Sequence, residues 1–289
     1  MSELKLRPPK QPERRSEMGE HASWITQFVN HHLGGAALAL LSALHIRPEN
    51  PELPIPEHVV MGLLVLVVGT LLALFVRSRL SVEKPGASQQ IAEMLLHNPL
   101  GFGINDVLEE NAGHHWKRYV PMVGSVALFI LIANLFGVFP FLTAPTSTAT
   151  VPLACAIITF LYFNWQGIRH HGPLGYVKTF TGGLDWWLVP LIFPVEILST
   201  TARLLSLTVR LWANIFASDM IYGLFLGLFA GPAVWGWTKS PVLGVILGIL
   251  PALVPIAFIG LHIFVSVIQT YVFTILPAVY IGLATADEH

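Results

Sequence analysis

The residues from Val59 to Val76 read VVMGLLVLVVGTLLALFV and carry no charged side chain. A helix of about 18 to 20 mostly apolar residues is long enough to cross the hydrocarbon core of a bilayer, which is about 30 Å thick. Arg77, Arg79 and Lys84 follow this run, and basic residues collect on the cytoplasmic side of membrane proteins. The pattern predicts a membrane-spanning helix that ends in the cytoplasm, which places the N-terminus of the chain outside.

The composition of the whole chain is also typical of a membrane protein. Hydrophobic residues make up 54% and charged residues 11% of the 289 residues, and the mean hydropathy is +0.64, whereas soluble domains carry roughly a quarter charged residues. The net charge of -1 provides no broad basic surface to hold nucleic acid. The single cysteine, Cys155, lies in an apolar run and excludes an intrachain disulfide or a multi-cysteine metal site.

The first 54 residues differ from the rest of the chain. Acidic and basic residues alternate up to Glu20, with three prolines among them, which is typical of a disordered tail rather than of a transit or signal peptide. The apolar stretch from Leu33 to Leu44 is only about a dozen residues long, too short to span a bilayer. We therefore predict a tail with a short interfacial amphipathic helix over residues 1–54 and a membrane domain over residues 55–289.

The membrane domain contains four further apolar runs, and the last two each exceed 40 residues. One perpendicular crossing needs only about 20 residues, so each long run is a helical hairpin, a kinked helix or one inclined helix. The lack of a strong turn signal favours two long, strongly tilted helices. The predicted fold is an all-α polytopic membrane protein with a polar surface segment over residues 89–115 and a cytoplasmic C-terminus. Its five membrane-embedded helices are expected near residues 58–77, 119–141, 148–167, 186–230 and 241–285.

The first of the two long runs carries charged residues, which are costly in hydrocarbon and usually line a polar path or have a partner. Glu196, Arg203 and Arg210 follow one another at intervals of seven, which places them on one face of a helix. Asn214 lies one turn beyond Arg210 on that face, whereas Asp219, nine residues from Arg210, points to the opposite side. Polar groups are therefore expected on two sides of one central cation.

A second set of polar residues lies in the last long run, where His262 and Gln269 are seven residues apart and share a helix face. Polar side chains can also serve only to join helices, and this alternative applies to Asn214, Gln269, Ser206 and Asn134. Arg203 is close enough to the start of its helix to reach lipid headgroups. Arg210 is flanked by apolar residues far from such an interface, so for this residue a purely structural role is disfavoured.

No feature of the sequence indicates an active site or a metal site. Adjacent histidines occur in pairs, but no HExxH or multi-cysteine spacing accompanies them, and GxSxG and Walker A sequences are absent. We predict no metal, no cofactor and no catalytic activity for the chain by itself.

The residues around Arg210 resemble the signature of subunit a of F-type ATP synthases, the ATPase A chain family. The segment that carries this resemblance reads LTVRLWANIFASD from Leu207 to Asp219. The C-terminal segment from Gly260 to Ile281 is similar to the final helix of that family. Further similarity is found over residues 30–33, 134–140 and 284–289.

The resemblance implies a stationary subunit that conducts protons to and from a rotating ring of c subunits, whose helices each carry a membrane carboxylate. Arg210 would face this ring, with Asn214 and Gln269 as its neighbours. It also implies b subunits of a peripheral stalk and membrane lipid as partners, no nucleic acid, and a bacterial inner membrane as the location.

By the same resemblance, Asp219 and His262 would line a half-channel open to the outside, and Glu196 one open to the cytoplasm. One position departs from the family pattern, because many bacterial relatives carry an acid where this chain has Gly137 in the segment Asn134–Gly137. The outer path is therefore expected to depend more on His262, Asp219 or water.

Two other classes of protein share some of these features. A proton-coupled secondary transporter also contains buried acids, arginines and histidines, and a membrane scaffold uses polar residues only for packing. A carrier works when purified alone, whereas a synthase subunit copurifies with its complex.

Overall fold

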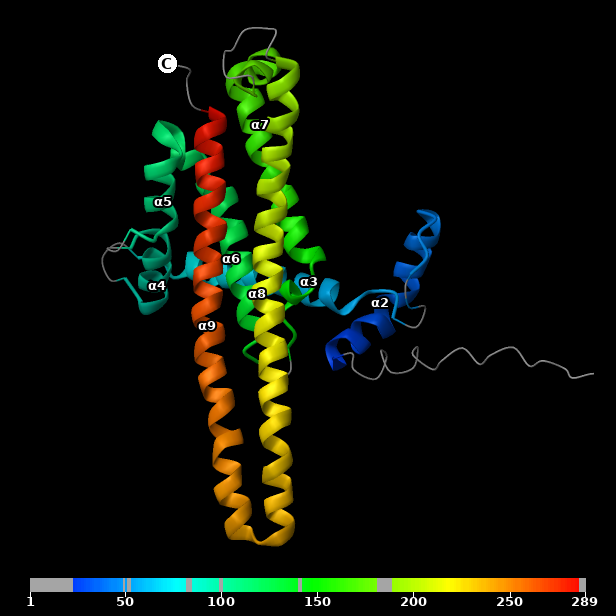
Figure 1. Cartoon of the computed structure of the whole chain (residues 1–289). Helices are drawn as coiled ribbons and strands as arrows, with labels where there is room; N and C mark the ends of the chain where they lie inside the picture. Colours follow the sequence, from blue (N-terminus) through cyan, green and yellow to red (C-terminus); the bar gives the residue numbers. More distant parts are fainter. Residues whose placement is uncertain are drawn as a thin grey trace, which may run out of the picture. The chain divides into compact units, whose positions relative to one another are not determined.

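A computed structural model of the chain describes residues 23–48, 50, 53–81, 85–98, 101–139, 142–180 and 189–285, although not the side chains of some residues within the helices. Every regular element in these ranges is helical (Figure 1), which confirms the predicted all-α fold. Four helices are long and apolar enough to cross a membrane, and a fifth apolar helix is shorter. The chain divides into two compact units, Met1–Met61 and Gly62–His289.

The first unit contains helix α2 (Trp24–Ala43), which is longer than the predicted interfacial helix. Its start is set by Ser23, whose hydroxyl oxygen accepts the backbone N–H of Thr26 at 3.3 Å and so satisfies one of the free donors of the first turn. Asn30 then joins α2 to the following segment, since its amide exchanges hydrogen bonds with the N–H and the carbonyl of Ile55 at 2.9 and 3.0 Å. Helix α3 (Glu57–Ser78) begins in this unit and corresponds to the first predicted span.

In the second unit a helical hairpin follows the polar segment. Helix α6 (Val120–Phe136) ends before the predicted position 141, and the 3-10 turn η2 (Pro145–Ser147) leads to α7 (Thr150–Phe180). The end of α6 tightens into i+3 hydrogen bonds, beginning with the N–H of Gly137 to the carbonyl of Asn134. Helix α7 extends past the predicted limit near 167 and bends at Gly172, which has a φ of 72° and allows this left-handed conformation without a Cβ clash.

The two long apolar runs are two continuous helices, as expected, and not helical hairpins. Helix α8 (Val189–Lys239) has 51 residues and α9 (Pro241–Thr285) has 45, and the two lie side by side and antiparallel (Figure 1). Ser240 makes the turn, where its hydroxyl oxygen accepts the N–H of Leu243 at 3.2 Å. At about 1.5 Å per residue, each helix is more than twice the thickness of the hydrocarbon core, so their steep inclination in the membrane remains our prediction.

Packing within the second unit centres on α8 and α9. Leu207, Leu211 and Ile215 of α8 are buried against Phe273 of α9 and residues of the α6–α7 hairpin. Cys155 belongs to this cluster and is buried as a thiol among apolar neighbours. Many apolar side chains of α3, α8 and α9 are exposed, a distribution suited to contact with lipid or with other apolar chains.

The polar segment forms two short helices, α4 (Ala87–Leu96) and α5 (Ile104–Asn111), followed by the 3-10 helix η1 (Gly113–Arg118). The carboxylate of Asp106 closes the α4–α5 turn by accepting the N–H of Asn98 at 2.8 Å, and its other oxygen lies 2.6 Å from Nδ1 of His97. The pKa of Asp106 is below its ordinary value, first because of the Asn98 N–H donor and also because of His97. The ionised Asp106 carboxylate therefore stabilises the folded state at pH values above the ordinary carboxyl pKa of 3.8. This contribution is lost as the pH falls through the lowered pKa.

This carboxylate is expected to hold the α4–α5 turn together. In Asp106→Ala, the amide of Asn98 loses its acceptor, so hydrogen exchange at Asn98 and at the end of α4 should become faster. Glu109→Ala, which removes an exposed acid from the same helix, serves as the control and should leave the exchange unchanged. Equal exchange in the Asp106 variant and the wild type at neutral pH would contradict this role.

Candidate functional site

Helix α8 presents two different faces along the segment that contains the predicted site residues. One face is buried at four-residue intervals by Leu207, Leu211 and Ile215. The exposed side also carries large apolar residues such as Leu205 and Val209, but a row of small or polar residues runs along it around one cation. We call this row the Arg210 stripe, and it comprises Ala202, Ser206, Arg210, Asn214 and Ala217. Because the apolar face is packed against the rest of the unit, the stripe is directed away from it.

The two arginines of α8 have different surroundings. Arg203 is half-buried, and its guanidinium carbon lies 5.3 Å from the ring centroid of Tyr280 on α9, a distance that allows a cation–π interaction. Arg210 is exposed, and among the side chains that the structure describes no carboxylate is within ion-pair distance of it. Arg203 therefore has a partner in Tyr280, whereas none of the described carboxylates forms an ion pair with Arg210.

His262 lies where α6, α8 and α9 meet, and its side chain is only 6% exposed. Its Nε2 is 2.9 Å from the backbone carbonyl of Asn134 at the end of α6. Its Nδ1 is 3.3 Å from the hydroxyl of Ser218 on α8. Asp219, the next residue on α8, is half-buried and interacts electrostatically with the imidazole. The structure therefore brings Asp219, His262 and Asn134 together, although they are far apart in the sequence.

Asn134 is itself fixed by the turn that follows α6. Its side chain is fully buried, and its Oδ1 accepts the hydroxyl of Thr146 at 2.6 Å. Its backbone carbonyl accepts the N–H of Gly137 at 3.1 Å in addition to the bond with His262. A Cβ on Gly137 would lie 2.8 Å from Nε2 of His262, so the imidazole occupies the space that a side chain at position 137 would need.

Gln269 lies two turns from His262 on α9 and is also buried, with 4% exposure. The contact between Ser218 and His262 sets the antiparallel register of α8 and α9, and moving about two turns along each helix places Gln269 near the height of Arg210. Its Oε1 has no hydrogen-bond partner among the described residues. A buried acceptor of this kind requires a water or a further donor.

The remaining predicted site residues, Ser206, Asn214 and Glu196, all belong to α8. Ser206 and Asn214 are exposed on the Arg210 stripe. Glu196 belongs to α8, but its side chain lies outside the described residues, so its predicted position on the cytoplasmic side is not tested.

Sequence reasoning missed three hydroxyl groups of the buried cluster. Ser218 contacts His262, Thr146 holds Asn134, and Ser266 donates to the carbonyl of His262 at 2.7 Å. Ser218 directly precedes Asp219 in the segment that carries the family resemblance, which was the available signal. Thr146 lies in the short 3-10 turn η2, outside α6, so no helical periodicity could have connected it with Asn134.

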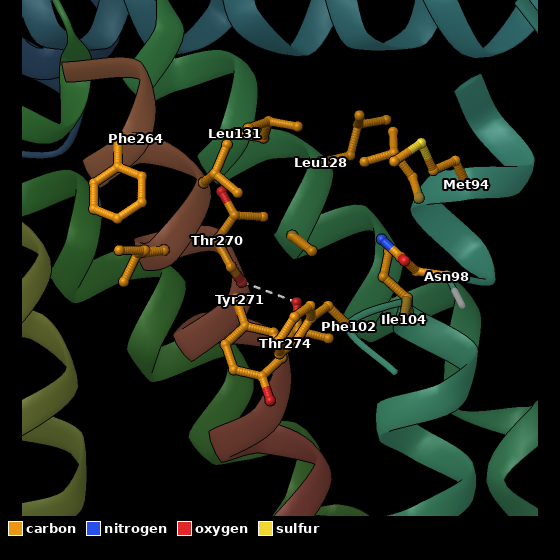
Figure 2. A pocket seen from close by; sticks show the side chains of 14 residues that line it. Met94, Asn98, Phe102, Ile104, Leu128, Leu131, Phe264, Thr270, Tyr271 and Thr274 are labelled. Carbon is orange, nitrogen blue, oxygen red and sulfur yellow. Dashed lines mark hydrogen bonds between the residues drawn. The ribbon is translucent and has the colours of Figure 1, made fainter. Parts of the chain in front are cut away.

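A separate cavity of about 450 Å³ lies between α4, α5, α6 and α9 (Figure 2). Its walls are mainly apolar and include Met94, Leu128 and Phe264. The polar residues at its wall include Thr274, whose hydroxyl donates to the carbonyl of Thr270 at 2.9 Å. None of the predicted site residues lines it. In the described ranges, no group of three or more His, Cys, Asp and Glu side chains is placed to hold a metal ion.

Comparison with known proteins shows that the amino-acid sequence is similar to that of one family. A family model described as "ATP synthase A chain" matches residues 58–282. The chain is 39% identical over 273 residues to "ATP synthase subunit a" of Koribacter versatilis, covering 93% of this chain and 99% of that protein. It is 36% identical to the protein of the same name from Solibacter usitatus, covering 91% and 100% respectively. A relative from Helicobacter hepaticus, again named "ATP synthase subunit a", is 34% identical over 78% of this chain and 88% of its own length.

The bond between Thr146 and Asn134 is expected to hold the α6–α7 turn against the buried cluster. Thr146→Val keeps the shape but leaves Oδ1 of Asn134 without a donor, which costs about 1–3 kcal/mol for a buried group. The thermal unfolding temperature of the purified protein in detergent should therefore fall. Ser147→Ala is the matched control, because its partly exposed hydroxyl bonds, among the residues that the structure describes, only to the carbonyl of Ala144 within the turn. An equal effect of the two substitutions would contradict a special role for Thr146.

Proposed function

The chain belongs to the ATP synthase A chain family, and on this premise we propose that it is the stationary proton-conducting subunit a of a rotary F-type ATP synthase. It is a multi-pass membrane protein and a non-catalytic subunit of the membrane sector, so ATP chemistry takes place elsewhere in the complex. The proposed task of this chain is to pass protons through two offset half-channels to and from the carboxylates of a ring of c subunits, and so to drive rotation.

One observation supports this proposal most directly, namely the exposed guanidinium of Arg210 on a stripe of small residues. Small side chains let another helix approach closely, and an arginine cannot lose its proton at physiological pH. A helix carrying one carboxylate, moving along this stripe, would meet a fixed positive charge. That charge favours the ionised carboxylate, so an arriving carboxylic acid would release its proton.

The two half-channels are proposed to lie on different sides of this cation. Asp219 is about 180° around the helix from Arg210 and about 14 Å along it, and it lies with His262 in the buried cluster at α6. We assign this cluster to the path from the outside. Glu196 lies about 21 Å from Arg210 in the opposite direction and is assigned to the path to the cytoplasm. Arg210 separates the two paths, because a permanent cation repels a proton that would move directly between them.

The remaining roles follow from the same assignment. Asn214 of the stripe and Gln269 would bind the carboxylate or water beside the guanidinium, and Arg203 would stay a structural cation held by Tyr280. The c-ring, the b subunits of the peripheral stalk and membrane lipid are the proposed partners, in a bacterial inner membrane with the N-terminus outside. Protons are the proposed coupling ion, and the membrane potential supplies about 2.3 kcal/mol per charge for each 100 mV. A secondary transporter is disfavoured, because the relatives named above are all synthase subunits.

Removal of the central cation provides the test. Arg210→Ala should abolish proton-driven ATP synthesis in membrane vesicles, because nothing then ionises the passing carboxylate, while the amount of assembled synthase stays near the wild-type level. Arg210→Lys should also lose most of its activity, because a lysine in a dry site can give up its proton.

Arg79→Ala is the matched control, since this exposed arginine follows the end of α3 and lies over the ring of Phe75. Coupled synthesis should persist in this variant. Coupled synthesis at the wild-type rate in Arg210→Ala would overturn the proposal.

A further inference from the structure

We propose that His262 exchanges protons only through Nδ1, and that the hydroxyl of Ser218 carries the proton between this nitrogen and the Asp219 side of α8. The other ring nitrogen, Nε2, would remain a permanent hydrogen-bond donor that caps α6. This inference rests on the proposed function, in which Asp219 and His262 belong to the outer proton path. It adds Ser218 and Gly137 as the residues that decide which imidazole nitrogen exchanges protons.

The first step concerns Nε2, which faces the backbone carbonyl of Asn134 at 2.9 Å. A carbonyl oxygen only accepts hydrogen bonds, so Nε2 must carry the hydrogen in this contact. The carbonyl is one of the last four of α6, which have no partner within the helix, and the N–H of Gly137 at 3.1 Å satisfies it only in part. Breaking the bond to His262 would leave a buried carbonyl poorly satisfied, so the bond is expected to persist in both charge states of the ring.

The second step concerns Nδ1. In a neutral imidazole with its hydrogen on Nε2, Nδ1 is an acceptor. The group next to it is the hydroxyl of Ser218 at 3.3 Å, and a hydroxyl can donate and accept. Ser218 therefore donates to Nδ1 of the neutral ring and accepts from Nδ1–H of the imidazolium. A serine is suited to a relay for this reason, whereas a glycine or an alanine at this position would leave Nδ1 without a partner from α8.

Proton transfer through this contact balances without any further reactant. The Ser218 hydroxyl gives its hydrogen to Nδ1, while its oxygen takes a proton from the Asp219 carboxyl group or from a water on that side. The ring becomes an imidazolium, with the end of α6 favouring the positive charge at its negative dipole end. In the onward step Nδ1–H returns a proton to the Ser218 oxygen, whose own hydrogen passes to a different acceptor, a water farther along the α8–α9 seam. No proton crosses the ring toward α6, so the outer path runs along the seam between α8 and α9.

Gly137 makes this arrangement possible. A Cβ at this position would lie 2.8 Å from Nε2 and 3.0 Å from Cε1 of His262, and 3.3 Å from the Cβ of Ala144. With a side chain at position 137, the imidazole could keep its bond to the Asn134 carbonyl only if that side chain moved toward Ala144 and displaced it. Gly137→Ala should therefore push the ring away from α6 and free Nε2 from its fixed role.

Proton conduction by the complete synthase in membrane vesicles tests the relay. Ser218→Ala should slow proton flux by about a hundredfold, the lower end of what the loss of a proton-transfer group costs, with wild-type amounts of assembled complex. Ser218→Thr keeps the hydroxyl and should restore most of the flux, which a loss of packing would not explain. Ser125→Ala is the matched control and should conduct normally, because within the described part of the chain this exposed hydroxyl bonds only to the Met122 carbonyl of its own helix.

Wild-type flux in Ser218→Ala would overturn the relay, and this result is distinct from failure of the proposed function. If Arg210→Ala still abolishes synthesis while Ser218→Ala conducts normally, the subunit assignment stands and only the Ser218 inference fails. If both variants remain fully active, the proposed function fails as well.

A direct measurement of the tautomer does not depend on flux. Nitrogen-15 NMR of the assembled complex with labelled histidine, taken as a difference spectrum against His262→Asn, should show the hydrogen of neutral His262 on Nε2. The same measurement on Gly137→Ala should show a mixture of tautomers. A neutral His262 with its hydrogen on Nδ1 in the wild type would overturn the proposal, even if the Gly137 variant does not assemble.

Discussion

The buried packing of one face of α8 is the constraint on which the proposed site depends. Leu207, Leu211 and Ile215 are held against α9 and the α6–α7 hairpin, and this contact fixes the rotation of the helix about its axis. With that rotation set, Arg210 must point to the exposed side, because it lies one residue before Leu211 and therefore about 100° away from it. A helix turned by the same angle would bury an unpaired guanidinium, which costs far more than the apolar contacts contribute.

The early end of α6 has a comparable influence on the other side of α8. In a membrane, every backbone carbonyl needs a partner within the protein or in a water-filled cavity. Helix α6 ends at Phe136, so its last carbonyls, including that of Asn134, accept i+3 N–H groups from the following turn in place of the regular helical bonds. His262 bonds to one of them, and this bond, together with the Thr146–Asn134 and Ser218–His262 contacts, connects α6, α8, α9 and η2 through a few polar groups. The same bond leaves Nδ1 of the imidazole facing Ser218 on α8, so helix capping and the proposed proton path are coupled.

The accuracy of the helix predictions varied with the kind of signal. Long apolar runs correctly predicted α3, α8 and α9, because in hydrocarbon a chain of that length can satisfy its backbone only as a helix. The ends were less accurate. Helix α2 starts at Trp24, about two and a half turns before the apolar stretch, since its mixed first half is stabilised by the Ser23 cap and by Asn30. Helix α6 stops earlier than its apolar run, where i+3 bonds and the prolines of the following turn take over.

The sequence by itself determined the membrane environment, the family and the face of α8 on which Arg210, Asn214 and Ser206 lie, because hydropathy, motif and helical periodicity are local properties. It also indicated that His262 and Gln269 share a face of α9. Only the tertiary structure decided that Arg203 is held by Tyr280 while Arg210 stays exposed. The tertiary structure also decided that the ring of His262 lies between Asn134 and Ser218. These contacts join residues up to 128 positions apart. The periodicity within one helix does not predict the register and rotation of the neighbouring helices, so the sequence pattern could not predict these contacts.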